Sequence, residues 1–486
     1  MSFLKNKKIL LILLFLFSLA VNFLFLSWEF IDDQSDNPFM VKPPKSPALN
    51  YYQNNTNYSE QKKFSYVRCD SFSYLETAIE IKKFSPPNTL KRAPAYPLFL
   101  SFFLPNNIKL ALFTQSILGA FVPVLLYLII LQFTKKKSVA FVFSIFFALD
   151  YQIITYYSVL LTEGLSIVLI LVSLYLHIEH FKKLNSRKLL IVLLVFDALL
   201  IFLKPTFIIL PALLYLSKIF LVIFNKNKRP IWPPIKILIL GIVVSMFFVM
   251  SYMGLNYYRY KRFIFTDILD INIMGKILQY NYIDSYITKK DSPVIIKDII
   301  KFYHAGIDEK LMPIKHPYVF TALLAKNIEN YDSVGLKKIN SYFLKGRYFE
   351  FGIRSIKALP QRLLEDRLFF SRPAINIEKS SFYIWVNRIF DYINKLKILG
   401  FLSAIILWIY FFRKKMEKEC VALTIILVST FSILLMISSF SYPHRATVRL
   451  RIPIETLLNL LVFLPFIVAI NHLNIFKNKK IKNIRK

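Results

Sequence analysis

The sequence predicts an all-α polytopic membrane protein with about ten transmembrane helices. Of its 486 residues, 56% are hydrophobic, the mean hydropathy is +0.48, and long apolar runs recur along the chain. A soluble domain is about 45–50% apolar, whereas a lipid core of about 30 Å requires about 20 apolar residues per helix. The net charge of +34 sits in short clusters between apolar runs. This pattern argues against a nucleic-acid binder, whose basic charge follows one polar face.

The first apolar run, 9–28, follows a lysine cluster and resembles a signal peptide. It is too long for one and lacks a small-residue cleavage site, so we expect an uncleaved anchor. Lysine and arginine clusters then alternate with the runs in a way that places both termini in the cytoplasm. We expect a multi-pass protein of the plasma (inner) membrane. Further spans are expected at 108–133, 138–155, 162–179, 188–203, 206–224, 235–254, 395–412, 419–440 and 453–471.

The expected spans divide the chain into three parts. An N-terminal transmembrane module, 1–254, contains a first external loop at 29–107. A second external segment, 255–394, is long enough for a small domain. A C-terminal transmembrane module with a basic cytoplasmic tail covers 395–486. In the first loop, apolar residues at helical spacing predict a membrane-surface helix over 69–83.

Two acids near the external ends of the spans are candidate functional groups, because charge is costly in lipid. Asp70 begins the expected surface helix, and Glu163 begins the fourth span. Each acid has a structural alternative, Asp70 as a helix N-cap and Glu163 in a first turn capped by Thr162. Asp32 and Asp33 compete with Asp70 for the role of first acid.

Basic residues lie on the same external side, against the positive-inside bias. Arg92 precedes a segment with paired prolines, and Lys204 lies between the fifth and sixth spans. Arginine binds phosphate through bidentate, charge-assisted hydrogen bonds. The alternatives are an interfacial anchor for Arg92 and lipid-headgroup contacts for the arginines at the last span. That span is preceded by His444, Arg445, Arg449 and Arg451, and Glu455 lies near its start. Carboxylates beside such cations suit transfer from a lipid phosphate to a hydroxyl or amine.

Five short motifs follow one another along the chain. They are Asp70-Ser71-x-x-Tyr74 with Ala78, Arg92-x-Pro94-x-Tyr96-Pro97, Leu160-Leu161-Thr162-Glu163, Lys204-Pro205-Thr206 and Arg449-x-Arg451-x-Pro453-x-Glu455. This ordered set resembles the polytopic glycosyltransferases of the GT-C fold. The resemblance is to the branch with protein O-mannosyltransferases and the lipid A aminoarabinose transferase, similar to glycosyltransferase family 39. Lys204 stands where the family has an arginine. The lysine keeps the positive charge but cannot form the bidentate hydrogen bonds of an arginine.

The resemblance implies an enzyme that moves a sugar, with inversion, from a polyprenyl-phosphate donor to an acceptor protein, lipid or glycan at the extracytoplasmic face. It implies Asp70 as general base and Glu163 in the same pocket, where Glu163 supports the site or helps to hold a divalent metal ion; metal use is left open. The implied substrate-binding residues are Tyr74, Arg92, Tyr96, Lys204, His444, Arg445, Arg449, Arg451 and Glu455.

Two alternatives come from other functional classes. A transporter or flippase of a lipid-linked saccharide also needs an external basic patch, and it predicts inverted repeats and broken helices with ionisable residues near mid-membrane. The charges lie mainly at the outer ends of the runs instead, although Asp197 lies inside the fifth span. A non-catalytic membrane scaffold would bind a partner through its large external segment. Membrane lipids are partners under every interpretation, and no nucleic-acid partner is expected.

Overall fold

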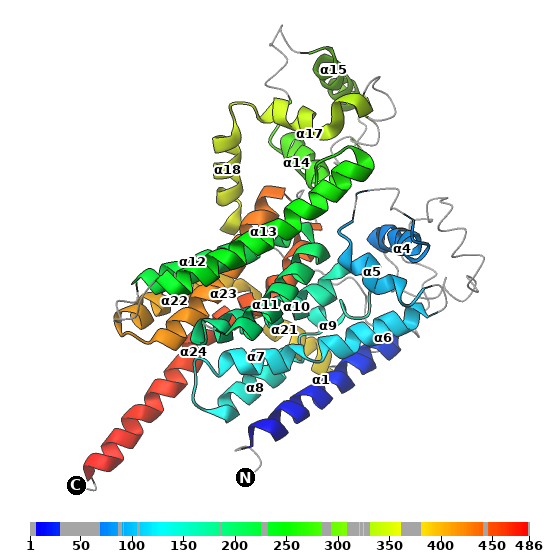
Figure 1. The fold of residues 1–486 in the computed structure, drawn as a ribbon. Coiled ribbons are helices and arrows are strands. Elements are labelled where there is room, and N and C mark those ends of the chain that lie inside the picture. Colours follow the sequence, from blue (N-terminus) through cyan, green and yellow to red (C-terminus); the bar gives the residue numbers. More distant parts are fainter. Residues whose placement is uncertain are drawn as a thin grey trace.

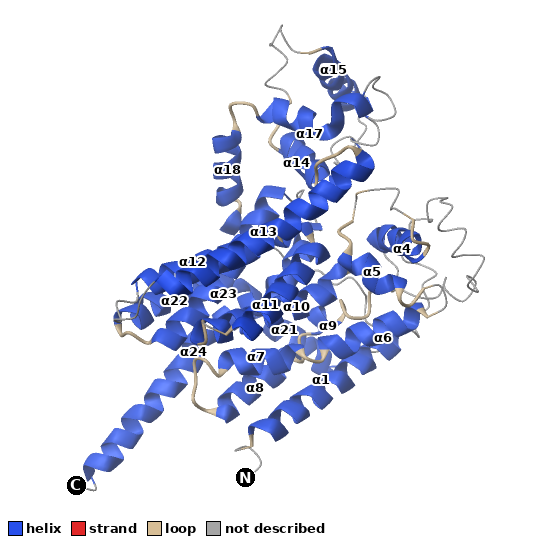
Figure 2. Cartoon of the chain, viewed as in Figure 1, coloured by secondary structure: helices blue, strands red, loops and turns tan. Residues whose placement is uncertain are grey.

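The structure of the chain is a computed structural model, and every secondary-structure element among its described residues is a helix (Figures 1 and 2). This confirms the all-α class. The described residues are 6–29, 69–85, 90, 92–104, 107–184, 186–224, 232–283, 293–308, 320, 324, 331–360, 381–440 and 446–484.

Among these residues, seven helical segments are long and apolar enough to cross a membrane, or eight if one bent pair is a single span. The bent pair is α21 (Ser381–Lys395) and α22 (Lys397–Arg413), with a bend of 57°. The seven are α1 (Lys7–Glu29), α6 and α7 (Ile108–Gly119 and Val122–Ile130), α10 (Thr162–Lys182), η2 and α12 (Pro205–Phe207 and Leu210–Phe224), α13 (Trp232–Tyr260), α23 (Glu417–Phe440) and α24 (Ala446–Ile484). The protein is therefore of the multi-pass membrane type.

Two expected spans are shorter helices, so the number of about ten stays a prediction. The segment 138–155 contains α8 (Lys137–Phe147) and the one-turn helix α9 (Tyr151–Ile154), and 188–203 lies in α11 (Arg187–Leu203). The surface helix expected over 69–83 is present as α4 (Cys69–Lys82), and α5 (Ala95–Ser101) follows it. Beyond α13 lie α14 (Asp267–Gln279), α15 (Val294–Asp308), α17 (Tyr331–Leu344) and α18 (Tyr348–Lys357).

Successive long helices alternate in direction and give the bundle two distinct ends. At one end, here called the basic end, α1 begins at Lys7, α10 ends at Lys182, and α22 ends at Arg413. At the other, here called the loop end, α13 ends at Tyr260 and leads into α14, α15 and α17, which project away from the bundle (Figure 1). Each charged cluster therefore has a defined position along the helix axes.

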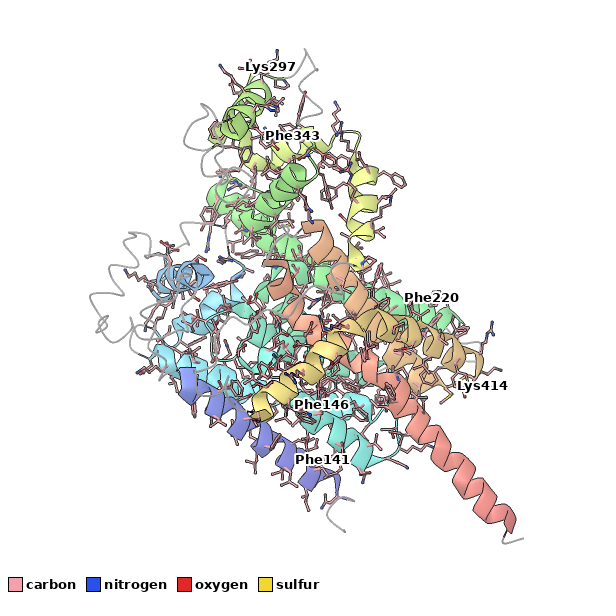
Figure 3. The ribbon with its side chains drawn as sticks, turned by 180° about the vertical axis from the view of Figure 1, so that it is seen from behind. Phe141, Phe146, Phe220, Lys297, Phe343 and Lys414 are labelled. Atoms are coloured by element: carbon pink, nitrogen blue, oxygen red, sulfur yellow. The ribbon has the colours of Figure 1, made fainter. Side chains whose placement is uncertain are left out.

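Aromatic side chains join elements that are far apart in the sequence. The Phe146 ring of α8 lies 4.7 Å from that of Phe390 in α21 and 5.3 Å from that of Phe463 in α24, near the centre of the view in Figure 3. A separate hydrophobic core, which includes Met274, Ile299 and Phe343, is built entirely from residues between 271 and 344. The projecting segment therefore has a core of its own, as a small domain requires.

Candidate functional site

Glu163 and Lys204 form a buried ion pair at the loop end of α10 and α11. Lys204 Nζ donates to Glu163 Oε1 at 3.0 Å, and the two side chains are 7% and 0% exposed, respectively. Lys204 is extended and directly follows α11. A buried pair requires such close geometry because two ions must leave water. The residue before α10 is Leu161, and no side chain caps this helix, so the interpretation of Thr162 as its cap is wrong. Thr162 Oγ1 instead donates to Glu163 Oε2 at 3.3 Å.

Tyrosine and amide side chains lie beside this pair. Tyr96 in α5 donates to Gln115 Oε1 at 3.2 Å. Gln115 Nε2 in turn donates to three backbone carbonyls within 156–159, at 2.9, 3.1 and 3.0 Å. The Tyr74 ring meets the Tyr96 ring edge-on at 5.1 Å. Burial raises the pKa of Tyr96 well above its ordinary value, and Tyr74 and Glu163 raise that pKa further. The Tyr96 hydroxyl therefore stays protonated and acts as a neutral donor.

Arg92 connects the same layer to α4. Its Nε donates to Ser73 Oγ at 2.6 Å, and its guanidinium carbon lies 4.5 Å from the Tyr74 ring centroid. Two residues before Ser73 in α4, Ser71 Oγ donates to the backbone carbonyl of Leu160 at 2.8 Å, and Leu160 lies just before α10. The structure thus brings Tyr74, Arg92 and Tyr96 together, and α4 packs against the segment that carries Glu163.

Asp70 is the second residue of α4, which begins at Cys69. It lies in the first turn instead of the expected N-cap position. Its side chain lies outside the described residues, as do Asp32 and Asp33 altogether. The general-base role of Asp70 therefore stays a prediction.

A second group of buried charges lies at the loop end of α22 and α24. Arg451 Nε lies 3.2 Å from Glu455 Oε2, and Arg451 Nη2 donates to Asn394 Oδ1 at 3.4 Å. Lys397 Nζ donates to Glu455 Oε1 and to Asn394 Oδ1. Arg451 and Lys397 are each 1% exposed. Two cations share the Glu455 carboxylate, which leaves one positive charge in excess among these three residues.

The other residues predicted at this mouth are only partly placed. His444 and Arg445 lie outside the described residues. Arg449 lies in α24, which begins at Ala446, but its side chain is not among those described. The burial of Arg451 does not fit the alternative of a superficial lipid-headgroup contact. Glu455 holds Arg451, so its first role is to position a cation.

Sequence reasoning missed several polar partners inside apolar runs. Lys397, Asn394 and Gln115 were not singled out, nor was the hydrogen bond from Asn459 Nδ2 to Asp150 Oδ2, at 3.0 Å. All of these side chains are polar or charged and lie within or beside an apolar run long enough to span a membrane. That position was the available signal, because polar groups in such helices usually pair with one another and mark functional sites.

Among the described residues, no group of three or more His, Cys, Asp or Glu side chains is placed to hold a metal ion. The Asp70 carboxylate is not among them, so the expected divalent metal near Glu163 stays untested. No protein-family model matches the chain, and no curated protein is detectably similar to it.

Proposed function

We propose that the chain is a membrane glycosyltransferase that moves a sugar from a polyprenyl-phosphate donor to an acceptor at the extracytoplasmic face. The observation that supports this most is the buried Lys397–Glu455–Arg451 cluster at the end of apolar helices. A polyprenyl phosphate joins an anion directly to a long apolar chain. A protein that binds it needs cations where its lipid-embedded helices end, and arginine suits phosphate by its planar fork.

In this proposal the loop end faces the extracytoplasmic side and the basic end faces the cytoplasm. Arg451 and Lys397 hold the donor phosphate and stabilise its charge as the bond to the sugar breaks. Glu455 positions both cations. Arg449, Arg445 and His444 come shortly before Arg451 in the sequence, and in this proposal they add to the phosphate site.

The layer around Glu163 serves the acceptor. Asp70 takes the acceptor proton as the acceptor oxygen attacks the anomeric carbon, and the polyprenyl phosphate leaves with the electron pair of the broken bond. Lys204 is paired with the Glu163 carboxylate at 3.0 Å, so in this proposal it positions Glu163 and does not contact the phosphate. Arg92 orients the acceptor through its remaining N–H groups. The Tyr96 hydroxyl, which donates its proton to Gln115, accepts a hydrogen bond from the acceptor.

The test uses purified protein in lipid nanodiscs with a panel of labelled polyprenyl-phosphate sugars. Donor binding and label transfer are measured separately. Asp70→Asn should retain binding and lose transfer by about 10²-fold or more, whereas Arg451→Lys should weaken binding. Glu179→Gln is the matched control, because its pair with Lys182, at 2.6 Å, is partly exposed and lies at the basic end. Full transfer by Asp70→Asn removes Asp70 from the base role, and binding of none of the donors contradicts the proposal.

A transporter or flippase of a lipid-linked saccharide is the second candidate, because α10 and α11 bury an ionisable pair, His177 and Asp197, at 3.3 Å and away from the loop end. Such groups often mark ion and proton pathways. Proteoliposomes with a labelled saccharide lipid in one leaflet separate the two functions. A transporter moves the intact lipid without a covalent product, whereas a transferase forms its product in detergent as well.

A further inference from the structure

Three helices bury a chain of polar side chains that the proposed function does not use. Asp197 Oδ1 in α11 accepts from Ser173 Oγ in α10 at 2.7 Å and lies 3.3 Å from His177 Nε2. One turn further along α10, His180 Nδ1 lies 3.4 Å from Lys218 Nζ of α12. All five side chains are completely or almost completely buried. We call these five residues the inner cluster.

The inner cluster is separate from the loop-end site. Ser173 lies near the middle of α10, and the histidines lie between it and the basic end. Glu163 and His177 are 14 residues apart on one helix, or about 21 Å at 1.5 Å per residue. No direct contact with the acceptor or phosphate site explains the inner cluster.

With Asp197 ionised and Lys218 protonated, the charges of the inner cluster balance when both imidazoles are neutral. The Asp197 carboxylate contributes one negative charge and the Lys218 ammonium one positive charge. A net charge buried among membrane-spanning helices is costly. Tyr215 packs against two members of the cluster. Its ring centroid lies 5.0 Å from that of His177 and 4.5 Å from Lys218 Nζ. Gly241 of α13 makes room for that ring, because a Cβ there would lie 2.4 Å from it.

Hydrogen-bond chemistry then assigns the ring tautomers. His177 Nε2 must donate to the Asp197 carboxylate, so its Nδ1 is an acceptor. The Lys218 ammonium donates to His180 Nδ1, so His180 Nε2 carries a proton. Neither His177 Nδ1 nor His180 Nε2 has a hydrogen-bond partner within the part of the chain that the structure describes. One unpartnered acceptor and one unpartnered donor therefore lie on adjacent turns of α10.

We propose that Asp197, His177, His180 and Lys218 form an intramembrane proton relay, with a binding site for one water molecule between the two imidazoles. The water accepts from His180 Nε2–H and donates to His177 Nδ1, which completes a path from Lys218 to Asp197. A buried water with such partners is an ordinary part of protein structure. The relay goes beyond the proposed function and does not depend on it.

Proton transfer along this path conserves every proton. Lys218 gives a proton to His180 Nδ1, and His180 gives its Nε2 proton to the water. The water passes a proton to His177 Nδ1, and His177 gives its Nε2 proton to Asp197. The ion pair becomes a neutral amine and a neutral acid, and both rings change from the Nε2–H to the Nδ1–H tautomer together.

The first test determines the tautomers of the two rings. Solid-state NMR of ¹⁵N-histidine protein in bilayers reports the tautomer of each ring, with His177→Asn and His180→Asn used to assign the two among the six histidines. We expect neutral rings that share one tautomer and change together, and Asp197→Asn should lock both as Nε2–H because the terminal proton acceptor is gone. Opposite tautomers in the two rings, or a charged ring at neutral pH, would overturn the relay.

The second test measures charge compensation. Asp197→Asn and Lys218→Met should each lower the melting temperature by several degrees, and the double variant should recover most of the loss. The partly exposed pair Glu179 and Lys182 of α10 is the control, and its single and double variants should melt like the wild type. Additive losses in the Asp197→Asn/Lys218→Met variant would show that the two charges do not balance each other.

Discussion

Gly400 of α22 is the position where one added methyl group tests the packing of the bundle. A Cβ there would lie 2.8 Å from Val462 Cα, 2.8 Å from Val462 Cγ2 and 2.9 Å from Val462 N in α24. Two of these three atoms are backbone, so no side-chain rotation relieves the overlap. Carbon atoms normally approach to about 3.5–4.0 Å, so Gly400→Ala requires the two helices to separate by about 1 Å.

The expected cost follows from two opposing effects. Overpacking of a core costs about 1–3 kcal/mol, whereas alanine is favoured over glycine inside a helix by about 1 kcal/mol. Because two of the close atoms are backbone, we expect an overpacking cost of about 2–3 kcal/mol here. After the helix-propensity gain of about 1 kcal/mol, Gly400→Ala should lower the free energy of unfolding by about 1–2 kcal/mol. Lys397 precedes Gly400 by one turn and bonds to Glu455 of α24. The same displacement should therefore lengthen that contact and weaken donor binding.

Unfolding of purified protein in one detergent, followed by tryptophan fluorescence, measures the effect. Gly254→Ala in α13 is the matched control, because a Cβ there meets no atom within 4 Å. It should stabilise the protein by about 1 kcal/mol through helix propensity alone. The reasoning is refuted if Gly400→Ala is as stable as the wild type, or if Gly254→Ala is destabilised to the same degree.

Three further predictions concern titration and buried polar groups. Burial raises the pKa of Asp270 in α14 to about 6; the folded state then holds this proton more tightly than the unfolded state does. The stability of the 271–344 core should therefore fall by up to about 3 kcal/mol as pH rises from about 4 through 6, and hydrogen exchange should show this dependence lost in Asp270→Asn. Gln115→Leu leaves three backbone carbonyls and the Tyr96 hydroxyl without this partner, and thermal unfolding should show a loss of about 1–3 kcal/mol; an unchanged melting temperature would contradict that contact. Glu163→Gln leaves Lys204 buried without its carboxylate and should cost about 3–5 kcal/mol, most of it recovered in Glu163→Gln/Lys204→Met; equal losses in the single and double variants would contradict the ion pair.

Hydropathy and charge clusters predicted where most helices lie, and the differences have local causes. The run 138–155 is interrupted because α8 ends at Phe147 and Asp150, which has a non-helical backbone, precedes α9. Its carboxylate is retained in an apolar run because Asn459 of α24 donates to it. The last span was expected to end at 471, and α24 continues beyond it to Ile484, through the basic tail.

The candidate site was predictable in part. The motifs singled out Glu163 and Lys204, whose side chains are in contact, and they selected Arg451 and Glu455, which lie one turn apart on a helix. Lys397 was not predicted because it lies 58 residues from Glu455 in the sequence. The inner cluster was represented only by Asp197, since its histidines and Lys218 come from two other helices.

The sequence by itself determined that the chain is helical, that it is built for a membrane, and which charged residues lie near the ends of its apolar runs. Those properties depend on neighbouring residues along one segment. Only the tertiary structure decided that Lys204 pairs with Glu163, that two cations share Glu455, and that Asp197 meets His177 while Lys218 meets His180. Such pairs depend on the rotation and axial register of helices from distant parts of the chain, because a buried charge is stable only where a partner from another helix reaches it.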